Sequence, residues 1–159
     1  MGYVETCAGI ARIWHAGMVD LAGEDYFAGH LTQVAKSVEK YGEDAVCVAY
    51  LHDILEDTDL SITELSYILR STISDEYFLC RVVEAVSAMT KYPSEKYDDY
   101  LDRVYGNNLA RIVKIADLEH NSDLSRLPSI TDRDLRRNEK YSRAISFLNP
   151  CYFFSEIKL

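Results

Sequence analysis

The feature that most constrains the fold is the spacing of apolar residues, which recur every three or four positions along most of the chain. In the first stretch, Cys7, Ile10, Ala11, Trp14 and Met18 follow this spacing. Such a period places apolar side chains on one face of an α-helix, whereas a half-buried strand would need alternation. With only 3 prolines and 7 glycines among 159 residues, little interrupts the pattern. The sequence therefore predicts an all-α fold, and its length suits one domain over residues 1–159.

Helix boundaries follow from caps and from the ends of the apolar pattern. Ser61 followed by Glu64 predicts a capping box, and Gly42 predicts a helix end. The segment after Gly42 is almost wholly apolar, so we expect it to form the central helix. The aromatic residues 152–154 are expected to pack back on the body. The predicted helices span residues 4 to about 23, 29–41, 44–56, 61–70, 75–89, 94–105, 109–121 and 132–148.

Charge and cysteine usage exclude several classes of protein. The formal net charge of −9 argues against a broad nucleic-acid surface, although a small phosphorylated substrate could still be bound beside a metal and a few local cations. No apolar run approaches the roughly 20 residues of a membrane span, and no signal peptide is recognisable, so we expect a cytoplasmic protein. Neither a disulfide framework nor a thiolate zinc site is indicated by the four scattered cysteines, Cys7, Cys47, Cys80 and Cys151.

Four ionisable residues lie close together at the end of the apolar segment 44–56. His52 and Asp53 are adjacent, and Glu56 and Asp57 follow one helical turn later. Residues three or four apart share a helical face, so the two pairs should form two stacked layers. Charged groups are rarely buried unless they are paired or bind a metal. The segment therefore predicts part of a divalent metal site, with Glu56 and Asp57 orienting a water molecule or taking its proton.

Two further ligands are expected from elsewhere in the chain. His30 opens the second predicted helix, and Asp117 lies in an apolar run where an unpaired carboxylate would be costly. Each residue alone has an ordinary structural explanation. His30 could be a helix cap or a surface residue, and Asp117 could be a buried ion pair with Lys114. His15 and His120 could likewise be simple polar residues. Together with His52 and Asp53, however, His30 and Asp117 favour one metal site with four protein ligands.

These motifs resemble the HD-domain phosphohydrolases, and within them the hydrolase domain of RelA/SpoT-type enzymes and small alarmone hydrolases. The family's Leu-His-Asp-x-x-Glu-Asp-Thr motif is complete at residues 51–58. Looser matches are the family's first motif at residues 15–26, its Val-Thr-Lys at 89–91, and its Lys-Leu-Ala-Asp-x-x-x-Asn at 114–121. The resemblance runs from about His15 to Tyr141 and implies a helical HD-domain fold.

The resemblance also implies roles for individual residues. His30, His52, Asp53 and Asp117 would bind one divalent metal ion, manganese being expected and zinc, iron or magnesium being the alternatives. Glu56 and Asp57 would be the catalytic carboxylates. The nucleoside would contact Asn121 and Tyr141, and the phosphates would contact Lys91, Lys114 or Arg137. The implied reaction is removal of the 3′-pyrophosphate from guanosine tetra- or pentaphosphate.

The sequence departs from this family pattern on the substrate side. Asp20 and Met18 stand where the family has Arg and Gln, and Ser87-Ala88 replaces an Asp-Gly. An anion at position 20 would be unfavourable beside a polyphosphate, so three alternatives to the alarmone hydrolase stay open. They are another HD-type nucleotidase or nucleoside triphosphate hydrolase, a non-catalytic nucleotide-binding regulatory domain, and a helical interaction module without metal. The sequence leaves the oligomeric state open.

Overall fold

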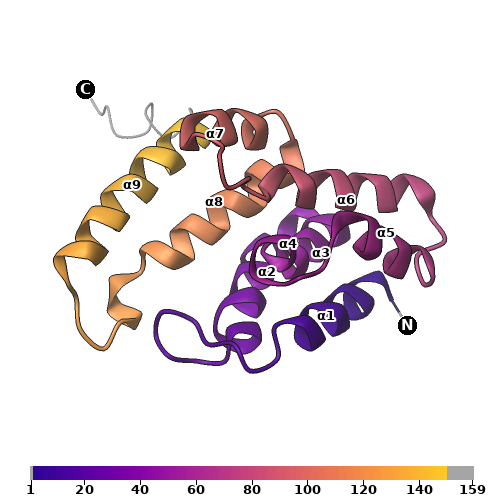
Figure 1. Cartoon of the computed structure of the whole chain (residues 1–159), viewed down its shortest axis with the longest axis horizontal. Coiled ribbons are helices and arrows are strands. Elements are labelled where there is room, and N and C mark those ends of the chain that lie inside the picture. Colours follow the sequence, from indigo (N-terminus) through magenta and orange to yellow (C-terminus); the bar gives the residue numbers. More distant parts are fainter. Residues whose placement is uncertain (1, 150–159) are drawn as a thin grey trace.

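The computed structural model describes residues 2–149, and these form helices joined by short connections (Figure 1). Within that range the only β-type pairing is an isolated antiparallel bridge between Val19 and Asp25. The all-α prediction is therefore confirmed. The predicted packing of the aromatic residues 152–154 lies outside the described residues. No helix in the described part of the chain is both long and apolar enough to cross a membrane.

The first part of the chain builds helices α1 to α4. Their bounds are α1 (Tyr3–Trp14), the π-helical turn η1 (Phe27–Leu31), α2 (Thr32–Val38), the 3-10 turn η2 (Glu39–Tyr41), α3 (Glu43–Leu51) and α4 (Ile54–Asp57). Gly42 separates η2 from α3 with a φ of 108°, a conformation that side-chain-bearing residues rarely adopt.

Two boundaries in this part differ from the prediction. Helix α1 ends at Trp14 rather than near residue 23, because Gly17 adopts a positive φ of 83° and the chain turns away. The predicted 44–56 helix is broken at His52 and Asp53. There the Nδ1–H of His52 donates to the carbonyl of Ala49 over 2.7 Å, and Ala49 O is the acceptor that a continuous helix would offer to the Asp53 N–H. The break separates α3 from α4 and leaves the His-Asp pair between them.

The second part of the chain matches the predicted helices closely. Its elements are α5 (Ile62–Arg70), α6 (Glu76–Met89), α7 (Tyr97–Tyr105), α8 (Asn108–Ser122), the 3-10 turn η3 (Leu124–Arg126) and α9 (Asp132–Leu148). Ser61 and Glu64 form the predicted capping box at α5, and Thr131 and Asp134 form a second one at α9. Asp75 and Asn107 cap α6 and α8 through their side chains.

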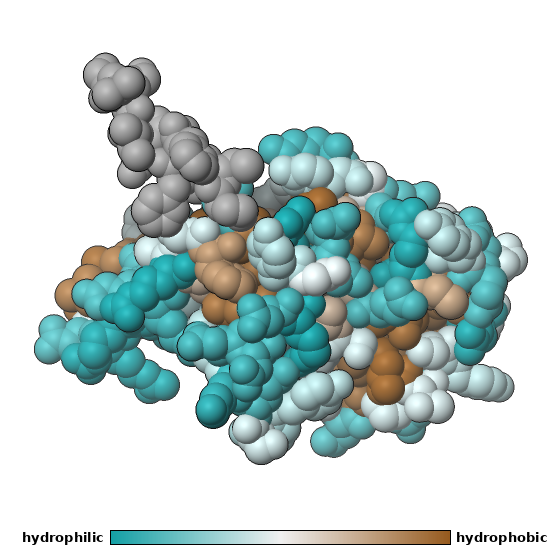
Figure 2. All heavy atoms as spheres, turned by 90° about the horizontal axis from the view of Figure 1, so that it is seen from above, coloured by the Kyte–Doolittle hydropathy of each residue, from teal (hydrophilic) through white to brown (hydrophobic). Residues whose placement is uncertain are grey.

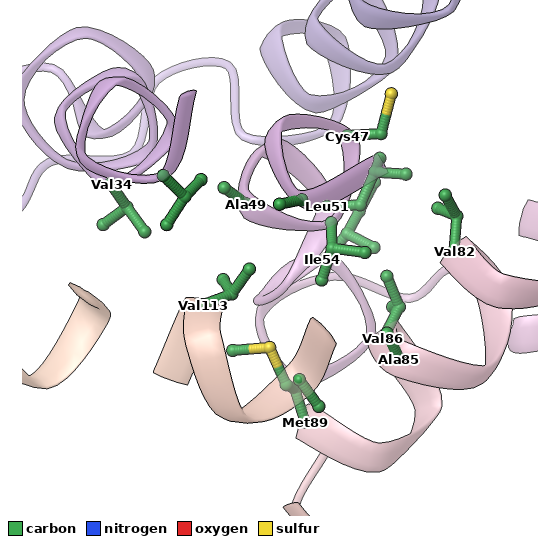
Figure 3. Packing of buried hydrophobic residues seen from close by; sticks show 14 of the residues in the cluster. Val34, Cys47, Ala49, Leu51, Ile54, Val82, Ala85, Val86, Met89 and Val113 are labelled. Carbon is green, nitrogen blue, oxygen red and sulfur yellow. The ribbon is translucent and has the colours of Figure 1, made fainter. Parts of the chain in front are cut away.

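Helix α3 lies at the centre of the core, as expected, and packs against α1, α2, α6 and α8. Its side chains Ala49 and Leu51 are fully buried, together with Ile54 of α4. Figure 3 shows these residues facing Val34 of α2, Val113 of α8 and a row of α6 side chains that ends at Met89. Helices α8 and α9 run side by side along one end of the molecule (Figure 1). On the face shown in Figure 2, hydrophilic side chains cover much of the surface and hydrophobic ones form separate patches.

Candidate metal centre

Three segments that are distant in the sequence bring the four predicted ligands together. The turn η1 carries His30, the break between α3 and α4 carries His52 and Asp53, and α8 carries Asp117. Both imidazoles and the Asp117 carboxylate are almost fully buried, with 1 to 3% of each residue exposed. One ligand atom from each of the four residues lies within 4.8 Å of the other three. That clustering is compatible with a single ion at the roughly 2.0–2.2 Å typical of nitrogen and oxygen ligands.

The ligand atoms point toward one another. His30 Nε2 lies 3.3 Å from Asp117 Oδ1 and 3.5 Å from Asp53 Oδ2, and His52 Nε2 lies 2.9 Å from that same Asp53 oxygen. The two Nε2 atoms are 3.4 Å apart. Because the carbonyl of Ala49 can only accept, the proton of a neutral His52 ring is on Nδ1, and its Nε2 lone pair faces the cluster.

Electrostatics of the cluster favour a cation. Burial disfavours the charged form of His52, but Asp53 and Asp117 outweigh burial and hold the pKa of His52 well above its usual value. Burial also opposes ionisation of the two carboxyls. Even so, His52 lowers the pKa of Asp53, and Lys114 lowers the pKa of Asp117, in both cases well below the usual range. Two ionised carboxylates thus face two imidazoles, a donor set that fits a divalent metal ion.

Asp117 belongs to the His-Asp cluster and also forms the ion pair with Lys114 that the sequence suggested. Its Oδ2 accepts a hydrogen bond from Lys114 Nζ over 2.8 Å, so the buried ion pair exists. Its Oδ1 faces His30 and accepts from Asn121 Nδ2 over 2.7 Å. Lys114 and Asn121 therefore hold the Asp117 carboxylate in place. The family resemblance implies in addition that both contact the substrate, and Asn121 also lines the cavity described next.

A cavity of about 600 Å³ opens beside the cluster. We call it the His30 cavity. It brings together one predicted catalytic carboxylate and three predicted substrate-binding residues, Asp57, Asn121, Arg137 and Tyr141. The remaining lining residues are Met18, Val19, Asp20, Leu21, Tyr26 and His30.

The second predicted catalytic carboxylate, Glu56, lies beside a different cavity. Its Oε1 accepts a hydrogen bond from the backbone N–H of Lys91 over 2.8 Å, and both residues line a neighbouring cavity of about 370 Å³. The side-chain ammonium of Lys91 donates to the carbonyl of Tyr92 over 3.2 Å. Lys91 and Glu56 are thus adjacent, and neither lines the His30 cavity. Burial is the main cause that raises the pKa of both Glu56 and Asp57 above the ordinary carboxyl range.

Sequence reasoning missed several residues around the cluster. Tyr26 donates its hydroxyl hydrogen to Asp53 Oδ2 over 2.6 Å, and burial and Asp53 raise its pKa. His15 lies after α1 rather than on it, is 1% exposed, and stacks on Tyr26 with ring centroids 5.4 Å apart. His120, which could have been an exposed residue, contacts His30 over 2.9 Å between Nδ1 atoms. Arg126 forms ion pairs and hydrogen bonds that no local pattern indicated.

The fold and the buried His-Asp cluster together define the class of protein. Residues 27–122 match the model of the HD domain family, and this segment includes all four clustered ligands. The chain belongs to the HD domain family, and its fold and site are those of a metal-dependent phosphohydrolase.

Two bacterial relatives are described by the same function. A probable guanosine-3′,5′-bis(diphosphate) 3′-pyrophosphohydrolase of Mycoplasma genitalium is 32% identical over 110 residues. A protein of that description from Mycoplasma pneumoniae is 29% identical over 107 residues. Each match covers 67% of this chain and 14% of the relative, so the chain spans only a small part of either protein's length.

A solved structure supports the fold. It belongs to a metazoan ortholog of SpoT that is described as hydrolysing ppGpp. It superposes with a TM-score of 0.70 at 19% identity, and the match covers 93% of this chain and 85% of the other.

Proposed function

We propose that this protein is a divalent-metal-dependent 3′-pyrophosphohydrolase of guanosine 3′,5′-bis(diphosphate). The observation that carries the proposal is the His30, His52, Asp53 and Asp117 cluster, which opens on a cavity lined by Asp57, Asn121, Arg137 and Tyr141. The functions described for the Mycoplasma relatives and for the SpoT ortholog agree with it. We further propose that residues 1–159 act as one HD domain, because one buried apolar cluster joins the described helices.

The proposed ion is manganese, held by the four clustered residues, with zinc, iron or magnesium as alternatives. When bound, such an ion supplies Lewis acidity toward a phosphoryl oxygen and makes a water molecule more acidic. We propose a cytoplasmic location, which the free thiols of Cys7, Cys47 and Cys80 support.

The chain's own residues supply the remaining chemistry. Asp57 lines the cavity, and its raised pKa makes it a stronger proton acceptor than an ordinary Asp. Arg137 provides a guanidinium at the cavity wall, already oriented by an ion pair with Asp134 over 2.7 Å. Tyr141 and Asn121 present polar groups to a nucleotide there. The Glu56 carboxylate accepts a hydrogen bond from the backbone N–H of Lys91. Its proposed catalytic role is therefore exerted from the neighbouring cavity, which both residues line.

The main objection from the sequence was the anion at position 20, and the structure weakens it. Asp20 lines the His30 cavity, but its carboxylate is paired with Arg126 and its side chain is only 4% exposed. The charge that would repel a polyphosphate is therefore compensated. Met18 and Asp20 still differ from the family pattern, so hydrolysis of another nucleotide is the second candidate function.

The test is turnover by the purified protein with Mn²⁺. We expect release of pyrophosphate from guanosine 3′,5′-bis(diphosphate), and Asp57→Asn should lower kcat by about 10²–10⁴-fold while Mn²⁺ binding is retained. A panel of nucleoside triphosphates assayed for phosphate and pyrophosphate separates the two candidates. Binding of Mn²⁺ and nucleotide without any turnover would favour a regulatory nucleotide-binding domain instead.

A further inference from the structure

A chain of hydrogen bonds leads outward from His30, on the side of the ring that faces away from the other ligands. His30 Nδ1 lies 2.9 Å from His120 Nδ1. The same His120 nitrogen lies 3.1 Å from a terminal nitrogen of Arg126. Arg126 in turn forms an ion pair with Asp20. We call Asp20, Arg126 and His120 the outer chain; its members come from the loop after α1, from η3 and from α8.

The direction of each hydrogen bond in the outer chain follows from its chemistry. A guanidinium has donors and no acceptor, so the Nδ1 of His120 must accept from Arg126. That nitrogen therefore carries a lone pair, and the proton of the neutral His120 ring is on Nε2.

The same reasoning fixes the proton on His30. Because His120 Nδ1 is an acceptor, the only hydrogen bond that can join the two rings is one donated by the Nδ1–H of His30. The Nε2 of a neutral His30 then carries the lone pair, and this is the atom that lies 3.3 Å from Asp117 Oδ1 within the cluster. The tautomer able to ligate a metal through Nε2 is therefore selected by the outer chain.

Asp20 completes the outer chain by holding Arg126. One of its carboxylate oxygens accepts from the backbone N–H groups of Ala22 and Glu24 over 2.9 and 3.0 Å, and the other pairs with Arg126. Arg126 also donates to the carbonyl of Gly29 over 3.3 Å, next to His30 itself. The Arg126 guanidinium that contacts His120 is thus held in place by Asp20 and by the carbonyl of Gly29.

We propose that Asp20, Arg126 and His120 are positioning residues that set the tautomer and orientation of His30 and thereby the metal affinity of the centre. This inference rests on the proposed function, since it concerns a ligand of the proposed metal. It is specific to His30, because the corresponding nitrogen of His52 is held by the backbone carbonyl of Ala49. Side-chain substitutions in the outer chain should therefore affect one imidazole ligand and leave the other in place.

The first experiment measures Mn²⁺ affinity by competition with a chelator. His120→Leu removes the acceptor, and Arg126→Gln removes the guanidinium. Each should weaken binding by about tenfold to a hundredfold, the usual effect of losing a group that orients a ligand. His120→Asn should stay near wild type, because its amide oxygen can occupy the position of Nδ1. Arg111→Gln on α8 is the matched control, since Arg111 contacts Asn108 and Tyr105 rather than the cluster, and it should not change affinity.

The second experiment reads the tautomer directly, by nitrogen-15 NMR of the metal-free protein at alkaline pH, where the cluster imidazoles are neutral. Wild type and His120→Asn should show His30 protonated on Nδ1, and His120→Leu should show loss of that preference with His52 unchanged. The inference is overturned if the His30 tautomer is unchanged in folded His120→Leu, or if Leu and Asn at position 120 weaken Mn²⁺ binding equally. If the wild type binds no Mn²⁺, the proposed function fails, whereas the tautomer comparison still decides this inference.

Discussion

At the scale of single residues, Glu56 and Asp57 are neighbours in sequence but have different surroundings. Asp57 lines the His30 cavity, and Glu56 is bonded to the backbone of Lys91 beside the neighbouring cavity. Adjacent positions on a helix point about 100° apart, so the two side chains leave the helix in different directions. Asp57 is therefore the better placed of the two to act on a substrate in the His30 cavity.

The pKa of Glu56 provides a prediction at this scale. Burial disfavours its charged form and raises its pKa, so in metal-free protein the carboxyl should stay protonated to a higher pH than an ordinary Glu. A divalent cation at the cluster favours the charged form, so adding Mg²⁺ should lower that pKa. Carbon-13 NMR of the Glu56 carboxyl across a pH titration measures both effects. Glu64, whose bonds to Ser61 lower its pKa, is the internal control and should not respond to metal. An ordinary pKa in the metal-free protein would contradict the prediction.

All four clustered residues could be predicted from the sequence. His52 and Asp53 are adjacent to each other, and Asp117 interrupts an apolar run. The outer chain could not be predicted. Asp20 and Arg126 are 106 positions apart, and nothing near either residue marks the other as a partner. The ion pair of Lys114 with Asp117 was already an alternative from the sequence, because the two residues are three apart, whereas the hydrogen bond from Asn121 Nδ2 to Asp117 was not considered.

At the scale of helices, boundaries were predictable where a local side chain makes the cap. Helix α9 begins and ends at the predicted residues, and Ser61 caps α5 as expected. The predicted end of α1 was wrong, and the break after α3 was not predicted. The apolar spacing continues past Trp14, although the helical backbone conformation ends there. The hydrogen bond from the His52 ring to the carbonyl of Ala49 has no signature in the sequence pattern.

The capping box at α5 gives a prediction at this scale. Ser61→Ala removes the acceptor for the Glu64 N–H, and we expect it to lower the free energy of unfolding by about 1 kcal/mol. Ser146→Ala in α9 is the control, because this exposed hydroxyl only bonds back to Ser142 O and alanine favours a helix. Urea denaturation followed by circular dichroism measures both variants. Equal stabilities for the two variants would show that the box contributes nothing.

The core around α3 gives a second prediction at this scale. Leu51 and Leu69 are both fully buried, so either Leu→Ala change should cost about 2–5 kcal/mol of unfolding free energy. Only Leu51 is next to His52, so Leu51→Ala should also weaken Mn²⁺ binding, whereas Leu69→Ala on α5 should not. Denaturation and chelator competition on the same two proteins separate stability from affinity. A loss of Mn²⁺ affinity in Leu69→Ala as large as that in Leu51→Ala would contradict the local effect.

At the scale of the whole molecule, the ligands join segments from three regions of the fold: η1, the α3–α4 break and α8. An ion that binds the folded state and not the unfolded chain stabilises it by about 2.7 kcal/mol at a hundredfold excess over the dissociation constant. For a chain of this size, that corresponds to a rise in Tm of roughly 5–11 °C.

We therefore expect Mn²⁺ to raise the melting temperature, and a chelator to reverse the rise. Asp117→Asn, which keeps the size of the side chain but weakens a ligand, should melt at nearly the same temperature with and without Mn²⁺. Differential scanning fluorimetry with and without metal measures the shift. A similar rise in Asp117→Asn and wild type would show that the ion binds elsewhere.

The distribution of the ligands over the sequence also has a consequence for biosynthesis. A nascent chain that has left the ribosome only as far as α7 contains His30, His52 and Asp53, but not the carboxylate of Asp117 or the Arg126 that orients His30 through His120. Selection of the metal must then wait until α8 and η3 have been synthesised and have docked. The ion that a cell installs at this site is thus chosen only after α8 and η3 have docked on the earlier helices.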